Sequence, residues 1–111
     1  MKKLFLFAVL APMFALFAEG VGGTYTVAGK NPGAGRYEGT CVISGDASTG
    51  YTFQWTIGEQ QFSGTGTLDG DTMTVDWGQP DPVVYKVSAD GAELKGKWGP
   101  NGKGREKLTR Q

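Results

Sequence analysis

The sequence predicts an all-β domain, a small eight-stranded antiparallel up-and-down β-barrel. After residue 20, no window spaces its apolar residues as a helix would, whereas apolar and polar residues alternate almost everywhere. Clusters of Gly, Pro, Asn and Asp divide this alternating sequence into eight short runs. All nine aromatic residues beyond residue 20 fall on the apolar parity. Each strand is therefore expected to have one buried face and one solvated face.

The first four predicted strands place Tyr, Phe, Trp, Val, Ile or Leu on the inward parity and mostly Thr, Ser, Glu or Gln on the outward parity. They are Thr24–Lys30 before the turn Asn31-Pro32-Gly33, Arg36–Ser44 before the loop 45–50, Tyr51–Ile57 before Gly58-Glu59, and Gln61–Leu68 before Asp69-Gly70. The Asp-Gly pair is typical of a two-residue type I′ hairpin turn.

The last four predicted strands show the same alternation, and their outward parity becomes rich in Lys and Arg. They are Thr72–Trp77 before the loop 78–82, Val83–Ser88 before Asp90-Gly91, Glu93–Trp98 before the loop 99–104, and Arg105–Arg110. No connection is long enough for a Greek-key crossover, so a meander that closes on itself is favoured over a sandwich. Glycines on the inward parity would let strands bend or aromatic rings approach closely: Gly39, Gly64, Gly66 and Gly96.

Residues 1–20 are predicted to be a secretory signal peptide, because two lysines precede the apolar run Leu4–Ala18. Cleavage after Ala18 or Gly20 is expected. The competing interpretation is a membrane anchor, but about 15 apolar residues are fewer than the ~20 that a span needs. No Cys directly follows the run, as a bacterial lipid anchor would require. We therefore expect residues 21–111 to form one periplasmic or secreted domain with no membrane span.

The composition excludes several kinds of catalytic and metal centre. The chain has 111 residues, no His and one Cys. Without His there is no His-ligated metal site and no Ser-His-Asp or Cys-His centre, and a lone Cys forms no intramolecular disulfide. Asp69-Gly70-Asp71 and Asp81 do not make a complete EF-hand loop. The sequence thus predicts no metal site, no cofactor and no enzymatic activity.

The inward aromatic residues are the main candidate for a binding site. An eight-stranded barrel is just wide enough for its side chains to fill it or to hold one small ligand. The same rings therefore predict either a packed core or an aromatic-lined mouth that binds a small apolar or aromatic molecule. The candidate ligand-binding residues are Tyr25, Tyr37, Tyr51, Trp55, Trp77, Tyr85, Trp98, Glu106 and Arg110.

Three inward residues of other types have two interpretations each. Glu106 and Arg110 are either polar anchors for a ligand or structural groups that tie the last strand to a neighbour, for instance through a Tyr hydroxyl. Cys41 is expected to behave as a small buried hydrophobe, with an intermolecular disulfide as the alternative.

Charge is distributed unevenly along a chain whose formal net charge is zero. Among the charged residues of 38–90, all except Lys86 are acidic. Among those of 94–111, all except Glu106 are basic. An outward basic patch is predicted on the last two strands, formed by Lys95, Lys97, Arg105 and Lys107. Such a patch attracts anionic partners, although it is also what a solvated face or a protected strand edge looks like.

Several short patterns resemble one family across nearly the whole chain beyond residue 20. They are Gly23-x-Tyr25-x-Val27-x-Gly29-x-Asn31-Pro32, Tyr37-x-Gly39, Tyr51-x-x-x-Trp55-x-Ile57-Gly58, Gly64-x-Gly66-x-Leu68-x-Gly70, Val83-Val84-Tyr85-x-Val87 and Glu106-x-Leu108. The sequence resembles a family of small exported proteobacterial β-barrel proteins of unknown function, some of which are labelled fibronectin-binding. This resemblance implies fold and export and supplies no catalytic residue. Similarity to lipocalins and avidins is confined to the fold.

Two functions follow as expectations. The first is non-catalytic binding of a small apolar or aromatic ligand in the barrel. The alternative is a surface interaction protein, an adhesin or inhibitor, that binds an anionic or protein partner of the cell envelope or the extracellular space through its basic outer face or the loops 45–50 and 78–82. Nucleic acid is not an expected partner, because the aromatic residues point inward.

Overall fold

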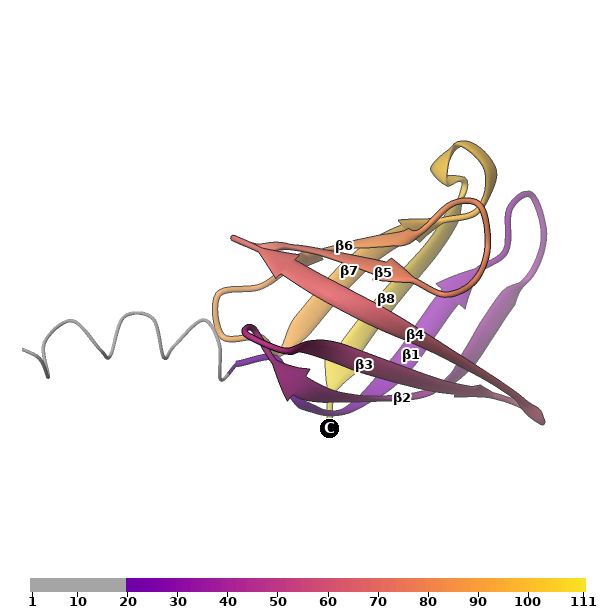
Figure 1. The fold of residues 1–111 in the computed structure, drawn as a ribbon. Helices are drawn as coiled ribbons and strands as arrows, with labels where there is room; N and C mark the ends of the chain where they lie inside the picture. Colours follow the sequence, from indigo (N-terminus) through magenta and orange to yellow (C-terminus); the bar gives the residue numbers. More distant parts are fainter. Residues whose placement is uncertain (1–19) are drawn as a thin grey trace, which may run out of the picture.

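The computed structural model describes residues 20–111, which form a closed barrel of eight antiparallel strands (Figure 1). Most of the predicted signal peptide lies outside the described residues. The strands are β1 (Gly23–Lys30), β2 (Arg36–Asp46), β3 (Gly50–Ile57), β4 (Gln60–Asp69), β5 (Thr72–Asp76), β6 (Val83–Val87), β7 (Glu93–Trp98) and β8 (Gly104–Arg110), with a 3₁₀ turn, η1 (Pro100–Gly102), before β8. The predicted fold class is confirmed.

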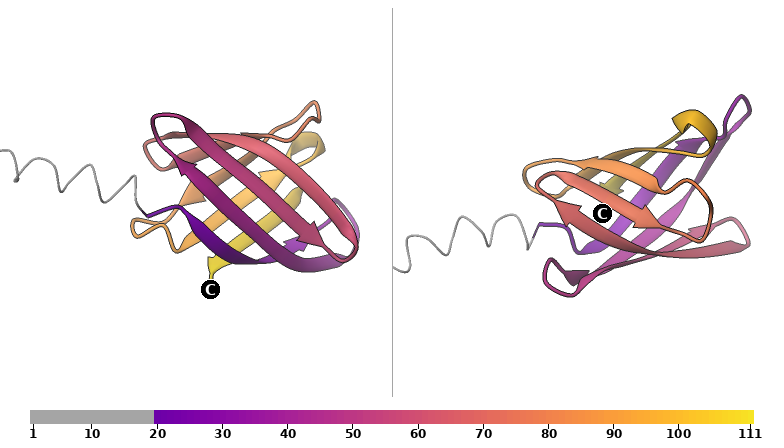
Figure 2. Two further views of the ribbon diagram at one scale, coloured as in Figure 1. Left: turned by 60° about the horizontal axis from the view of Figure 1, so that its bottom comes forward. Right: turned by 45° about the horizontal axis from the view of Figure 1, so that its top comes forward.

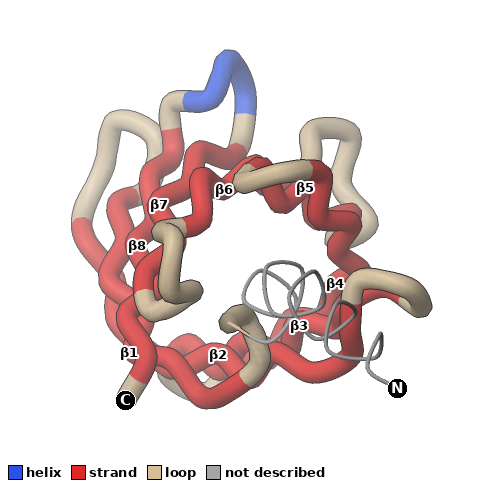
Figure 3. The backbone as a smooth tube through the Cα atoms, turned by 90° about the vertical axis from the view of Figure 1, so that its left-hand side faces the viewer, coloured by secondary structure: helices blue, strands red, loops and turns tan. Residues whose placement is uncertain are grey.

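Every strand pairs with the next one in the chain, and β8 pairs with β1 to complete the ring (Figure 3). The last pairing aligns Tyr25 with Arg110 and Lys30 with Arg105. Because the barrel is closed, it has no unpaired edge strand. The predicted strand bounds differ from the observed ones by two residues at most, and the loop predicted at 99–104 contains η1.

Burial follows the two-residue period of the sequence. Along β3, Tyr51, Phe53 and Trp55 are buried, while Thr52 and Gln54 between them are exposed. Phe53 stacks on Tyr85 of β6 with ring centroids 5.7 Å apart, so the core joins opposite walls of the barrel. Two of the glycines that were predicted to let aromatic rings approach closely have a ring packed against them. A Cβ on Gly96 would lie 2.5 Å from the Tyr85 ring, and one on Gly66 would lie 2.8 Å from the Phe53 ring.

One end of the barrel is closed by the start of the described chain. Val21 is only 1 % exposed, and its carbonyl oxygen lies 2.5 Å from the Tyr25 hydroxyl. The same hydroxyl lies 2.7 Å from the carbonyl oxygen of Gly91, in the β6–β7 turn. Gly91 has φ +73°, and a Cβ there would lie 1.6 Å from the Gly20 carbonyl oxygen, so a glycine is required.

The other end carries the β1–β2, β3–β4, β5–β6 and β7–β8 connections. In Figures 1 and 2, η1 (yellow) and the β1–β2 turn (purple) project together at this end. We call this end the mouth. Within residues 20–111, no helix has the length and hydrophobicity that a membrane span requires.

Candidate ligand site

A cavity of about 300 Å³ lies at the mouth of the barrel. Its wall consists of side chains from β2, β3, β4, β6, β7 and β8 and from the connections at this end. These residues are Asn31, Tyr37, Trp55, Ile57, Gln60, Phe62, Trp77, Val83, Trp98 and Glu106. The barrel is therefore filled at one end and hollow at the other, so it has both a packed core and an aromatic-lined mouth.

Aromatic rings in edge-to-face contact follow the wall of this cavity. Trp77 meets Phe62 at a centroid distance of 6.3 Å and Trp98 at 5.9 Å, and Trp98 meets Tyr37 at 6.2 Å. All four rings are only partly buried. The Trp77 indole N–H donates to the Asp81 carbonyl oxygen at 2.9 Å, which fixes the ring against the β5–β6 loop. The cavity thus has a rigid apolar wall with accessible ring surfaces.

Glu106 of β8 supplies the one carboxylate among the residues that line the cavity. It is 9 % exposed. Its Oε1 accepts a hydrogen bond from the Tyr37 hydroxyl at 2.7 Å, and its Oε2 accepts one from Trp55 Nε1 at 3.0 Å. The Tyr85 hydroxyl also donates to Oε2. Three strands other than its immediate neighbours, β2, β3 and β6, are thereby joined to β8 through one side chain.

The close approach of these donors depends on glycines beside Glu106. Gly29 of β1 and Gly96 of β7 are its direct cross-strand partners. A Cβ on Gly29 would lie 2.1 Å from the Tyr37 ring. The rings therefore occupy the space beside the carboxylate that side chains would otherwise fill.

The surroundings of Glu106 keep neighbouring groups protonated. Burial, and then the charge of Glu106, raise the pKa of Tyr37 and of Tyr85 above the ordinary value of a phenol. Burial and then Glu106 also raise the pKa of the Cys41 thiol to about 12. Both phenols therefore remain hydrogen-bond donors to the carboxylate across the physiological range. A carboxylate has about four lone-pair sites, so Oε1, with one donor, can accept another from a bound molecule.

The structure separates the predicted ligand-binding residues into two groups. Tyr37, Trp55, Trp77, Trp98 and Glu106 line the mouth, and Tyr85 lies beneath it against Glu106. The other predicted residues, Tyr25, Tyr51 and Arg110, do not line this cavity.

Arg110 serves the closed end instead. Its Nη2 donates to the Tyr25 hydroxyl at 3.3 Å, and its guanidinium carbon lies 5.6 Å from the Tyr25 ring centroid. Burial raises the pKa of Tyr25, and Arg110 partly opposes this. Of the two interpretations of Arg110, the structure supports the tie between the last strand and a tyrosine.

Five lining residues were not among the sequence candidates: Asn31, Ile57, Gln60, Phe62 and Val83. A usable signal was present in the sequence. In an up-and-down barrel, the last residues of odd strands and the first residues of even strands meet at one end. This rule assigns Trp55, Trp98, Tyr37 and Phe62 to the same end, and assigns Tyr25 and Arg110 to the other.

The remaining predicted sites also have definite places. Lys95, Lys97, Arg105 and Lys107 are exposed on the outer face of β7 and β8. Cys41 is buried and unpaired. Asp71 forms an ion pair with Lys86 at 3.2 Å.

The sequence matches no protein-family model, and a search of curated proteins finds no significant relative. The resemblance to small exported proteobacterial barrels therefore stays a prediction. The geometry of the mouth carries the functional argument alone.

Proposed function

We propose that this protein is a non-catalytic binding protein that holds a small, largely apolar or aromatic ligand in the mouth of its barrel. The observation that carries the proposal is the cavity of about 300 Å³, walled by aromatic rings and containing one buried, hydrogen-bonded carboxylate. Binding sites for small molecules are concave and mostly apolar, and a few fixed polar groups set the orientation of the ligand. The amino-terminal pattern supports action in the periplasm or outside the cell.

The polar chemistry of the cavity narrows the ligand class. Glu106 Oε1 accepts one protein donor and can accept a second. A ligand with a flat or apolar body and one N–H or O–H group would place that group on Oε1 and its body against Trp77 and Trp98. The edge-to-face arrangement of these indoles leaves ring surface for such a contact.

Binding explains this arrangement better than acid–base catalysis does. Glu106 is held by donors from Tyr37, Trp55 and Tyr85, which fixes the position and orientation of the carboxylate. Among the residues that line the cavity, no second carboxylate accompanies it. Reactions such as glycoside hydrolysis use two carboxylates with separate roles.

The direct test is native mass spectrometry of protein purified gently from its producing cell. A discrete mass excess that disappears on denaturation is expected, and its value would give the mass of the ligand. Release of that ligand from the variant Trp77→Ala, but not from Leu68→Ala, would assign it to the mouth. Leu68 is a partly buried core residue that does not line the cavity. A clean apo mass would refute the proposal, as would equal retention by both variants.

A further inference from the structure

Four cations lie side by side on the outer surface, one on each of four neighbouring strands. Lys97 of β7 is the direct partner of Arg105 of β8. Arg105 is in turn the partner of Lys30 of β1, and Lys30 is the partner of Arg36 of β2. All four residues are exposed. Since neighbouring strands are 4.7–4.9 Å apart, this cationic row extends over roughly 14 Å.

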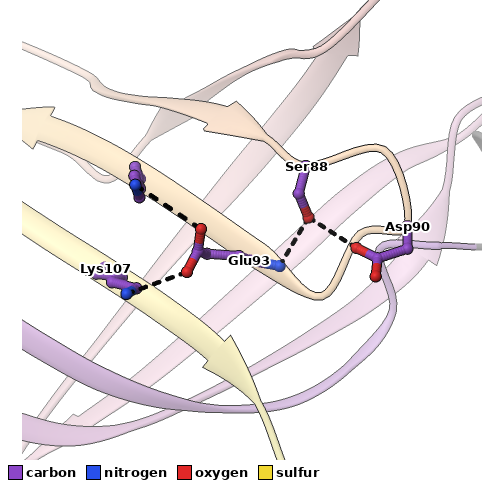
Figure 4. Close-up of polar contacts among 5 residues, drawn as sticks. Ser88, Asp90, Glu93 and Lys107 are labelled. Carbon is purple, nitrogen blue, oxygen red and sulfur yellow. Dashed lines mark hydrogen bonds and ion pairs between the residues drawn. The ribbon is translucent and has the colours of Figure 1, made fainter.

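Carboxylates do not neutralise the cationic row. Within residues 20–111, the ion pairs are Lys86 with Asp71 and both Lys95 and Lys107 with Glu93, so no member of the row takes part in one. Figure 4 shows Glu93 beside Lys107, with its own backbone N–H donating to the Ser88 hydroxyl. Lys95 Nζ lies 3.9 Å from the other carboxylate oxygen of Glu93. Lys95 and Lys107 are cross-strand partners of each other and share the single carboxylate of Glu93, which gives an internal comparison within one surface.

Like charges placed directly opposite each other on paired strands destabilise a sheet. One interpretation of basic outward residues is the protection of an exposed edge. That explanation does not apply to this surface, because β8 pairs with β1 and the described barrel has no edge. In the closed barrel, the cations of the row therefore have no strand edge to protect.

The cationic row lies along a depression of about 500 Å³ in the outer surface. Lys30, Arg36, Lys97 and Arg105 all line it, and so do Lys95, Lys107 and the carboxylate of Glu38. The depression also includes Ala28, a small residue of β1. Its cross-strand partners are Lys107 of β8 on one side and Glu38 of β2 on the other. A second depression, reaching Lys103 and η1, continues from Lys30, Lys97 and Arg105 toward the mouth.

We propose that the cationic row binds a linear acidic polysaccharide through sulfate or phosphate groups that repeat along its chain. A chain lying across the four strands would meet one cation at each strand. A membrane surface fits less well, since the depression is concave and the two exposed large hydrophobic residues, Val42 and Val84, do not line it. Single-stranded nucleic acid uses exposed aromatic rings for stacking, and none lines the depression apart from the inward Tyr37.

The test uses heparin oligosaccharides as the probe, in titration calorimetry at several salt concentrations. The wild type is expected to bind with an affinity that falls steeply with salt, as counterion release requires. Lys30→Gln combined with Arg105→Gln should weaken binding by about tenfold or more. The comparison variant, Lys95→Gln combined with Lys107→Gln, removes the same charge from two lysines that line the same depression but share the carboxylate of Glu93, and it should weaken binding less.

Three results would overturn the proposal. The first is absence of heparin binding by the wild type. The second is equal weakening by both double variants, which would show a response to net charge only. The third is binding of anionic lipid vesicles or of a single-stranded oligonucleotide that equals or exceeds heparin binding. A desulfated heparin fragment should not bind. The cationic row lies on the outer surface and the proposed ligand lies in the mouth. A failure of the polysaccharide proposal can therefore be distinguished from a failure of the proposed function.

Discussion

The Tyr85 hydroxyl donates a hydrogen bond to Glu106. We predict that Tyr85→Phe lowers the free energy of unfolding when Glu106 is present and raises it when Glu106 is replaced by Leu. In the wild type, Tyr85→Phe removes a donor to a buried carboxylate. Hydrogen bonds to charged groups contribute roughly 1.5–3 kcal/mol, so the variant should lose about that much of its free energy of unfolding. In a Glu106→Leu background, the same hydroxyl has lost its acceptor. There, Tyr85→Phe should increase stability by about 1–3 kcal/mol, because it removes a buried unsatisfied group.

The single change Glu106→Leu affects all three donors. Tyr37 retains an alternative acceptor, since its hydroxyl lies 3.4 Å from the Arg105 carbonyl oxygen. Trp55 Nε1 and the Tyr85 hydroxyl lose their acceptor, which costs about 2–6 kcal/mol in total at 1–3 kcal/mol each. Small domains have about 5–15 kcal/mol of stability, so this variant should fold marginally. If it does not fold, Glu106→Gln provides a milder background. Its amide oxygen can still accept from both donors but carries no charge, so there Tyr85→Phe should cost only about 0.5–1.5 kcal/mol, without a reversal of sign.

The assay is urea unfolding followed by tryptophan fluorescence at pH 7, applied to both singles and the double variant. Tyr25→Phe is the matched control, because Tyr25 donates at the closed end and distant changes are usually additive to within about 0.5 kcal/mol. Equal effects of Tyr85→Phe in both backgrounds would refute the reasoning. A context-dependent effect of Tyr25→Phe would indicate a global change instead.

Two further predictions concern titration and reactivity. The pKa values of Tyr37 and Tyr85 are raised in the fold, so their contribution to stability is complete below pH 10 and is lost above it. The free energy of unfolding measured with urea should begin to fall near pH 10 and approach a slope of about 1.4 kcal/mol per pH unit above it for Tyr85 alone; a flat profile would contradict this. Cys41 is buried, with a pKa of about 12, so a thiol reagent at pH 8 should label it only as fast as the protein unfolds, and rapid labelling of the native state would be the contrary result.

The strands could be predicted from the sequence because apolar and polar side chains alternate along each one, which shows which residues face inward. Trp55 and Tyr85 lie inward, as alternation predicts. The turn predicted at Asp69-Gly70 is wrong by one residue and in type: Asp69 pairs with Thr72, the connecting residues are Gly70 and Asp71, and only Gly70 has a positive φ (+64°), as in a type II′ turn. Trp77 was predicted at the end of a strand, but β5 stops at Asp76. The indole instead meets the carbonyl oxygen of Asp81 in the following loop.

Contacts across the barrel were not readable, because they depend on distances between strands that are not adjacent in the chain. Glu106 was recognised as an inward carboxylate, but its three donors come from β2, β3 and β6. In the same way, Lys30 and Arg36 join the basic surface only because β8 closes on β1. The predicted patch on β7 and β8 therefore contained half of the cationic row, together with two lysines that Glu93 compensates.

The dependence of the barrel on β8 bears on how the chain reaches its native state. This strand follows the other seven in the chain, yet it supplies the pairing partner of β1 and the acceptor for three buried donors. Until it docks, β1 and β7 have unpaired edges on which another chain can add. Folding dominated by such long-range pairing is slow. The barrel therefore stays open until β8 is available, and loss of β8 would leave an aggregation-prone sheet instead of a smaller stable domain.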